Sequence, residues 1–174
     1  MNENFDTIDI RLLEQLQMDA SQSNQQRAAQ LGISPATCLR RTRRLRALGV
    51  LEKEVAILDP EALARCTGAP QPLACVAEIS LDRQSQEALQ AFEARAVVEA
   101  GVQQCWRVSS GPDFVLIVQV ADMQAYQFLA QRLFGEDANV RNVKTYFVTR
   151  RAKFSTRMPI AAVDAAASAI AVAD

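Results

Sequence analysis

The chain has 174 residues, 49% of them apolar and 22% charged, which is typical of a globular protein. Its formal net charge of −1 excludes a generally polycationic nucleic-acid coat but allows a localised basic stripe. It has no histidine and therefore lacks the usual general base and the commonest metal ligand. We expect a protein that is not an enzyme and holds no metal or other cofactor.

The four cysteines are scattered, with no C-x-x-C pair, and we expect them to be reduced and mostly buried: Cys38, Cys66, Cys75 and Cys105. No apolar run approaches the roughly 20 residues of a membrane-spanning helix. The acidic start of the chain lacks the order of charged and apolar residues found in a signal peptide. These features predict a cytoplasmic protein with no membrane partner.

Two helices are predicted in the first 32 residues. The first carries apolar residues at helical spacing, with Asp6 or Thr7 as its N-cap: Ile8, Leu12, Leu13 and Leu16. The second, from Asn24 to Gln30, follows a capping Ser23 and ends near Gly32.

A third helix begins with serine at the N-cap and proline at the first helical position, Ser34-Pro35, and runs to about Leu48. A tight glycine-containing turn between the second and third helices indicates a helix-turn-helix motif. The residues Leu39, Thr42, Leu45 and Leu48 recur every three positions, so we expect the leucines to dock on a core. Cys38 is expected on the buried flank of this face.

Five arginines lie within seven residues of this third helix: Arg40, Arg41, Arg43, Arg44 and Arg46. One alternative is an ordinary solvated face of a surface helix. Surface helices usually interleave opposite charges, however, and no acid lies between Asp19 and Glu52. The run therefore predicts a recognition helix that contacts DNA.

Roles within the helix follow from the way that recognition helices dock, because their N-terminal part reads base edges. We predict base contacts from Thr37, Arg40 and Arg41, and phosphate contacts from Arg43, Arg44 and Arg46. Ser34 and Pro35, at the start of the helix, complete the predicted DNA-binding set.

The middle of the chain contains a predicted strand and a predicted linker. Residues 50–58 alternate in part and end at Asp59-Pro60, which predicts a strand. Residues 61–72 hold glycine and prolines and are predicted to be a linker. We therefore expect a DNA-binding domain over 1–60, a second domain over 73–154 and a disordered Ala-rich tail over 155–174.

The second domain follows the order β-α-β-β-α-β of a ferredoxin-like module. The expected elements are strands over 73–81, 102–109, 113–120 and 140–148, with helices over 85–98 and from Asp122 onward. Met123 and Tyr126 are interpreted as core residues, and Trp106 as an interface or core residue. Helices cover only one face of such a sheet, so we expect a partner subunit to cover the other.

Several of these strings resemble the leucine-responsive regulatory protein/AsnC family of transcriptional regulators. The resemblance runs over about residues 6–154 and includes Ile8-Asp9-x-x-Leu12-Leu13, Leu31-Gly32-Ile33-Ser34-Pro35, Leu58-Asp59-Pro60 and Asp113-Phe114. It implies an α+β protein with an N-terminal winged helix-turn-helix domain and a C-terminal ferredoxin-like domain. It also implies dimers that often assemble to octamers, and a small-molecule effector, usually an amino acid.

The family places its effector loop between the second and third strands of the C-terminal domain. The corresponding segment here is Ser109-Ser110-Gly111-Pro112-Asp113, with glycine one place later than in the family pattern. A simple hairpin turn is the alternative interpretation, since glycine and proline suffice for one. Asp113 either holds the ammonium group of an amino acid or caps the turn.

The sequence thus predicts a DNA-binding transcriptional regulator that responds to an amino acid through rearrangement of its oligomer. The changed loop leaves one alternative open, an architectural protein that wraps DNA without a ligand. A metabolic enzyme with a ferredoxin-like domain is disfavoured, because neither a histidine nor a nucleophile motif is present.

Overall fold

The computed structural model describes residues 5–160, which divide into two compact units. The helical unit comprises residues up to 56 together with the described residues after 152, and the sheet unit comprises residues 57–152. The chain therefore passes between the two units twice. Among the described residues, no helix has both the length and the apolar character needed to cross a bilayer.

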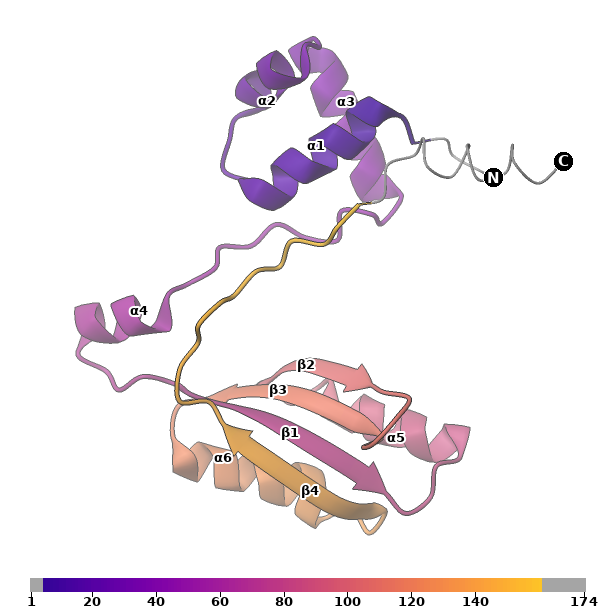
Figure 1. Ribbon diagram of the computed structural model, residues 1–174, viewed down its shortest axis with the longest axis vertical. Coiled ribbons are helices and arrows are strands. Elements are labelled where there is room, and N and C mark those ends of the chain that lie inside the picture. The colour runs from indigo at the N-terminus through magenta and orange to yellow at the C-terminus, as the bar shows by residue number, and fades with distance from the viewer. Residues whose placement is uncertain (1–4, 161–174) are drawn as a thin grey trace, which may run out of the picture. The chain divides into compact units, whose positions relative to one another are not determined.

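The helical unit consists of α1 (Thr7–Met18), α2 (Asn24–Leu31) and α3 (Pro35–Ala47) (Figure 1). Each begins at the predicted type of cap, with Asp6, Ser23 and Ser34 accepting hydrogen bonds from backbone N–H groups. Gly32 ends α2 in the left-handed conformation at φ 68°, which allows the tight turn into α3. The core gathers apolar residues from all three helices: Leu12, Leu13, Leu16, Ala28, Leu31, Cys38 and Leu45.

The buried stripe of α3 differs from the predicted one. Cys38, Thr42 and Leu45 are buried, whereas Leu39 and Leu48 are 41% and 39% exposed. The buried positions follow the i, i+4, i+7 spacing of a 3.6-residue helix, and the predicted three-residue repeat drifts away from that face. The predicted burial of Cys38 and Leu45 is confirmed, and that of Leu39 and Leu48 is wrong.

The segment after α3 also departs from prediction. Residues 52–58 form no strand, and Val55 and Ile57 are 65% and 55% exposed. A strand needs a neighbour for its backbone groups, and within residues 5–160 no segment pairs with this one. The predicted linker instead contains α4 (Pro60–Thr67), capped by Asp59 and ended by left-handed Gly68.

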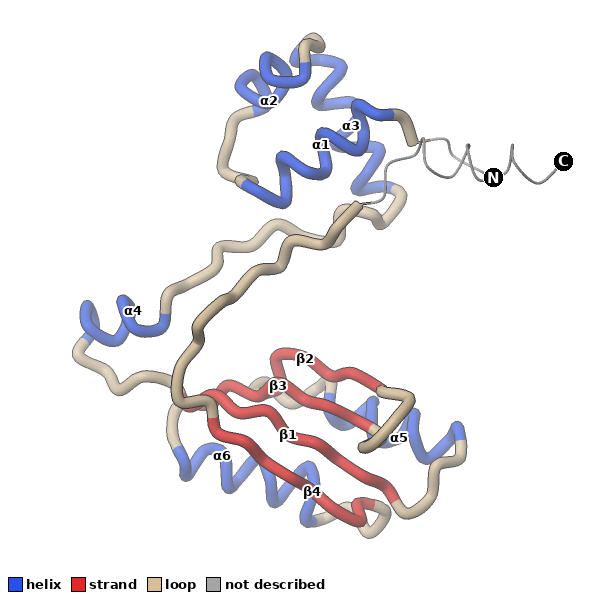
Figure 2. The backbone as a smooth tube through the Cα atoms, viewed as in Figure 1, coloured by secondary structure: helices blue, strands red, loops and turns tan. Residues whose placement is uncertain are grey.

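The sheet unit confirms the predicted β-α-β-β-α-β order. Its elements are β1 (Leu73–Leu81), α5 (Gln86–Ala96), β2 (Val102–Arg107), β3 (Phe114–Val120), α6 (Met123–Ala130), a π-helical turn (Gln131–Gly135) and β4 (Val140–Phe147). The strands form one antiparallel sheet in the order β2-β3-β1-β4, with α5 and α6 on the same face (Figure 2). The residues of β1 that face these helices are fully or nearly fully buried: Cys75, Ala77, Ile79 and Leu81.

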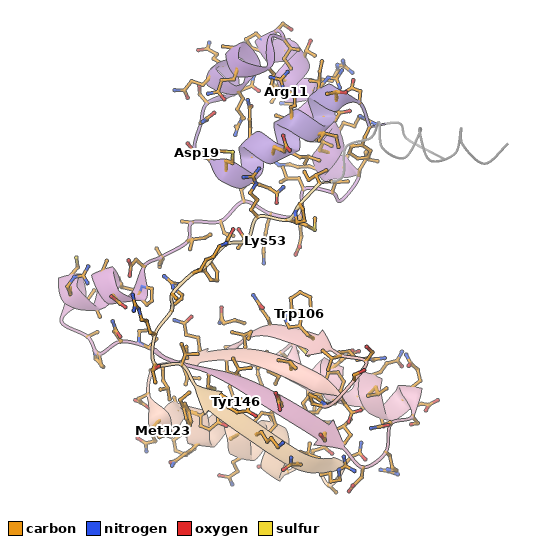
Figure 3. All side chains as sticks on the ribbon, viewed as in Figure 1. Arg11, Asp19, Lys53, Trp106, Met123 and Tyr146 are labelled. Atoms are coloured by element: carbon orange, nitrogen blue, oxygen red, sulfur yellow. The ribbon has the colours of Figure 1, made fainter. Side chains whose placement is uncertain are left out.

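The opposite face of the sheet has no helix over it in the described chain. The strand register places Val76 between Ile117 and Tyr146, and Val115 between Trp106 and Glu78. Trp106 and Tyr146 remain 57% and 53% exposed (Figure 3). We call these apolar residues the open face: Val76, Trp106, Val115, Ile117 and Tyr146.

The segment after β4 returns to the helical unit. The Gln17 side chain donates from Nε2 to the Met158 carbonyl at 3.1 Å and accepts the Met158 N–H at Oε1, 2.6 Å away. Ile160 packs against the core of the helical unit. Residues 155–160 of the predicted tail are thus placed against α1, and residues 161–174 lie outside the described part of the chain.

Candidate nucleic-acid interface and effector loop

The start of α3 is fixed by hydrogen bonds to its first turn. Ser34 Oγ accepts the Thr37 N–H at 3.2 Å and lies 2.9 Å from the Thr37 hydroxyl oxygen. Asn24, at the start of α2, donates from Nδ2 to the Pro35 carbonyl at 2.7 Å. The turn and the first residues of α3 are therefore held at a set angle. Thr37 is half-buried and its hydroxyl already has a partner, which does not suit its predicted role at base edges.

Arg41 points inward onto α1. Its Nη1 lies 2.8 Å from the Asp6 carboxylate and 2.8 Å from Asp9 Oδ1. Arg44 Nη1 lies 3.1 Å from the other oxygen of Asp9, which is buried with 1% of its side chain exposed. We call these four residues, Asp6, Asp9, Arg41 and Arg44, the buried ion network.

The buried ion network shows where two arginines of the run are held. Arg41 follows the buried Cys38 by three positions and precedes the buried Thr42, so its side chain starts on the inner flank of α3. There it meets α1, and its guanidinium is used in holding the two helices together. The outward placement predicted for Arg41 and Arg44 is corrected accordingly.

The charges of the network stabilise one another. Burial works against ionisation of Asp6, but the Asp9 N–H and the Arg41 guanidinium outweigh it and hold the pKa of Asp6 below its usual range. The hydrogen bond to Asp9 in turn raises the pKa of Arg41. Because folding lowers the pKa of Asp6, its contribution to stability is present above the unfolded value of 3.8 and is lost as the pH falls further.

The other arginines of the run remain at the surface. Arg46 forms an ion pair with Glu54. Arg40 and Arg43 are exposed, and within residues 5–160 neither has an ion-pair partner. The outward side of α3 therefore presents two cations that no acid of residues 5–160 neutralises, on the same side as Ala36 and Leu39. The acids that neutralise Arg41 and Arg44 come from a helix about 30 positions upstream, so local charge spacing does not reveal them.

The predicted effector loop is organised by Asp113. Its Oδ2 accepts the Leu81 N–H at 2.7 Å, and its own N–H donates to the Ile79 carbonyl at 2.8 Å. The carboxylate of Asp113 thus joins the loop to the end of β1. Gly111 has φ 91°, which only glycine adopts readily, and Ser109 and Ser110 are exposed.

A cavity of about 430 Å³, which the sequence does not predict, lies between α6, the π-helical turn and β4. The Tyr126 hydroxyl lies 2.5 Å from Thr145 Oγ1 in its wall, and Arg141 and Phe134 also line it. Tyr126 packs against the core as predicted, whereas Met123 is 46% exposed and is not a core residue. None of the loop residues 109–113 lines this cavity.

A helix-turn-helix unit with a basic outward face, joined to a ferredoxin-like unit, defines a two-domain DNA-binding regulator. Residues 5–46 match the AsnC-type helix-turn-helix domain, and residues 74–158 match the Lrp/AsnC ligand-binding domain. The chain is 33% identical to the leucine-responsive regulatory protein of Haemophilus influenzae, with 87% of this chain and 88% of that protein covered. It is 32% identical to an uncharacterised HTH-type regulator of Sinorhizobium fredii, over 90% and 89% of the two chains. The protein belongs to the Lrp/AsnC family of transcriptional regulators.

Solved structures support the same two-domain arrangement of the chain. The AsnC family transcriptional regulator of Agrobacterium tumefaciens is 26% identical, with a TM-score of 0.76 over 89% of this chain and 97% of that one. A transcriptional regulator of Neisseria meningitidis, solved in complex with L-Met, is 24% identical with a TM-score of 0.75. It covers 90% of this chain and 97% of its own, and at that identity it shows the shared fold.

Within the buried ion network, we expect Asp9 to contribute much more than Asp6 to the free energy of unfolding. Asp9→Asn should lower the free energy of unfolding of the helical unit by about 3 kcal/mol, because it removes the charge of a fully buried carboxylate that pairs with both Arg41 and Arg44. Asp6→Asn, at a side chain 51% exposed, should cost less than about 1 kcal/mol. Urea unfolding followed by far-UV circular dichroism measures both.

Trp106 provides an internal reference for this experiment, because it is the only tryptophan and lies in the sheet unit. Its fluorescence transition should be the same in both variants and in the unsubstituted protein. Equal and small losses for Asp9→Asn and Asp6→Asn would show that the network does not hold α3 against α1.

Proposed function

We propose that this regulator contacts duplex DNA through the outward side of α3, pairs with a second copy through the open face, and senses an amino acid in its sheet unit. The observation that carries the DNA-binding part is the division of the arginine run. Two arginines are neutralised internally by the buried ion network, and Arg40 and Arg43 face outward with no ion pair to any residue in the range 5–160. Such a regulator acts where the DNA is, which in a bacterium is the cytoplasm.

Within α3 we assign base reading to Arg40 and phosphate binding to Arg43 and Arg46. Arg40 lies in the second turn, in the half of a recognition helix that enters the major groove, where arginine reads guanine bidentately. Arg43 and Arg46 follow toward the C-terminal end, which supports a position at the DNA backbone. Ser34 and Pro35 position the N-terminus of α3. Arg41 and Arg44 are assigned to holding the helix in place.

This assignment predicts different binding defects for Arg40 and Arg43. Arg40→Ala should relax preference at one base pair of each half-site, at a cost of about 1–3 kcal/mol for the preferred base. Arg43→Ala should weaken binding to all sequences by about the same factor. Duplexes selected from a random pool by the unsubstituted protein, and single-base variants of them, measure both by gel shift at one salt concentration.

Arg65→Ala is a suitable control, because it removes an exposed arginine of the sheet unit that lies outside the helix-turn-helix motif. It should leave affinity and preference unchanged. Identical, sequence-independent losses for Arg40→Ala and Arg43→Ala would contradict the separation of roles.

The open face supports the pairing of subunits. The open face occupies adjacent register positions across all four strands, and no helix of residues 5–160 covers it. Aromatic residues with large exposed areas are enriched at the centres of protein interfaces. A second copy of the same face, related by a two-fold axis, is the proposed partner. Assembly of dimers to octamers, as the family resemblance implies, is part of this proposal.

A charge on the open face should therefore break the dimer. Trp106→Glu is expected to halve the particle mass measured by light scattering at micromolar concentration, or to reduce a higher assembly to smaller units. Met123→Glu provides the matched control, because Met123 is 46% exposed on α6, on the side of the sheet away from the open face. An unchanged mass for Trp106→Glu would exclude the open face as the subunit interface.

The effector proposal rests on the sheet unit. Residues 74–158 match a ligand-binding domain, and a regulator of the same fold has been solved with L-Met. The exposed backbone at Ser110 and Gly111 lets a small ligand approach closely, while Asp113 keeps the loop tied to β1. We propose that an amino acid binds beside this loop and shifts the population among oligomers, which alters how recognition helices match spaced half-sites.

Thermal unfolding in the presence of each of the common amino acids tests the effector proposal. A ligand at 100 times its dissociation constant should stabilise the folded protein by about 2.7 kcal/mol. Ser110→Tyr, which adds bulk at an exposed loop position, should abolish that shift, whereas Gln103→Tyr on β2 should retain it. If no amino acid raises the melting temperature, the alternative of a ligand-independent architectural protein that wraps DNA is favoured.

A further inference from the structure

Leu39 is exposed on α3 although its residue type suits a core. Its 41% exposure places it outside the helical core, which uses its neighbour Cys38 instead. A single exposed leucine is ordinary in a protein surface. This leucine is informative because of its position. It is one turn before Arg43 and next in sequence to Arg40, the two arginines that have no ion-pair partner in the described chain.

Residues three and four positions apart are neighbours on a helix surface. Ala36 and Leu39 are therefore adjacent, as are Leu39 and Arg43, and Arg40 lies one turn after Ala36. Ala36, Leu39, Arg40 and Arg43 are all exposed and form one strip along the outward side of α3. The strip begins with apolar side chains and ends with cations.

Few other side chains remain to read bases from the first two turns of α3. The Thr37 hydroxyl is paired with Ser34, and the Arg41 guanidinium is held by Asp6 and Asp9. Cys38 is fully buried. The groups left at the surface between Pro35 and Arg40 are therefore Ala36 and Leu39, which offer no hydrogen bond, together with Arg40.

An apolar side chain in the major groove has one matching group there. Each base pair presents donors and acceptors in this groove, and thymine alone adds an apolar one, its C5 methyl. We propose that Leu39, with Ala36 beside it, packs against a thymine methyl in each half-site, next to the base that Arg40 reads. This inference rests on the proposed DNA-binding function of α3, and it adds a base preference that the arginines do not supply.

Replacement of thymine by deoxyuridine tests this contact, because it removes only the methyl group and keeps the base pair. The probes are duplexes that the full-length protein selects from a random pool, with each thymine replaced in turn. Binding should weaken about three- to fivefold at one thymine per half-site, as expected for the loss of one buried methyl contact. The other thymines should show no comparable effect.

The Leu39→Ala protein should bind the thymine and deoxyuridine versions of that duplex equally. Arg40→Ala is the matched control at the neighbouring position. It should keep the preference for thymine over deoxyuridine and lose the preference at the base pair that Arg40 reads. Circular dichroism and the particle mass should be unchanged for Leu39→Ala, which separates a base contact from a role in folding or subunit pairing.

Three results would overturn the inference: no sensitivity to deoxyuridine at any position, the same sensitivity in Leu39→Ala, or a changed particle mass for that variant. All three leave the DNA-binding proposal standing, because the protein still binds the selected duplexes. Failure of the unsubstituted protein to bind any duplex would instead overturn the DNA-binding proposal itself, together with this inference.

Discussion

The helical unit depends on one buried carboxylate. Asp9 lies on α1 with almost none of its surface exposed, and both of its oxygens are held by arginines of α3. A buried charge is costly unless it is paired, so the folded unit keeps Arg41 and Arg44 turned toward α1. Asp6 joins the same network and also caps α1 together with Asp9. The angle and the rotation of α3 about its own axis are set by this arrangement.

The rotation of α3 determines which side chains are available to DNA. With Cys38, Thr42 and Leu45 buried and Arg41 held inward, the opposite side carries Arg40 and Arg43. An arginine run of this density would otherwise bind phosphates along its whole length, with little sequence preference. Because Arg41 and Arg44 are paired with Asp9, fewer cations of α3 face outward. Neighbouring positions on the outward side are then left for apolar contacts. In the sheet unit, Asp113 has a comparable role, because its carboxylate fixes a loop through a backbone N–H of β1.

The sequence predicts most of the architecture and less of the site. Caps such as Ser23, Ser34 and Asp59 act within one turn of the helix they start, and strand alternation is equally local, so both can be read from spacing. The pairing of Asp9 with Arg41 joins residues 32 positions apart and becomes visible only when α1 and α3 pack. The exposure of Leu39 has the same origin, because it depends on the rotation of α3 and not on its composition. The strand expected over residues 50–58 has no pairing segment in the described chain, and Met158 meets Gln17 across more than 100 positions.

Arg41 holds α3 against α1, whereas Arg43 is the arginine we propose to bind a DNA phosphate. The salt dependence of DNA binding separates the two directly. The slope of the logarithm of the binding constant against the logarithm of salt concentration is negative, and each lost phosphate contact reduces its magnitude by about 0.9. Arg43→Gln and Arg41→Gln proteins should be compared on one duplex at a temperature where circular dichroism shows both to be folded. Because a dimer places one Arg43 in each half-site, the slope should become less steep by about two for Arg43→Gln and stay unchanged for Arg41→Gln. Equal reductions in the two proteins would contradict this division of roles.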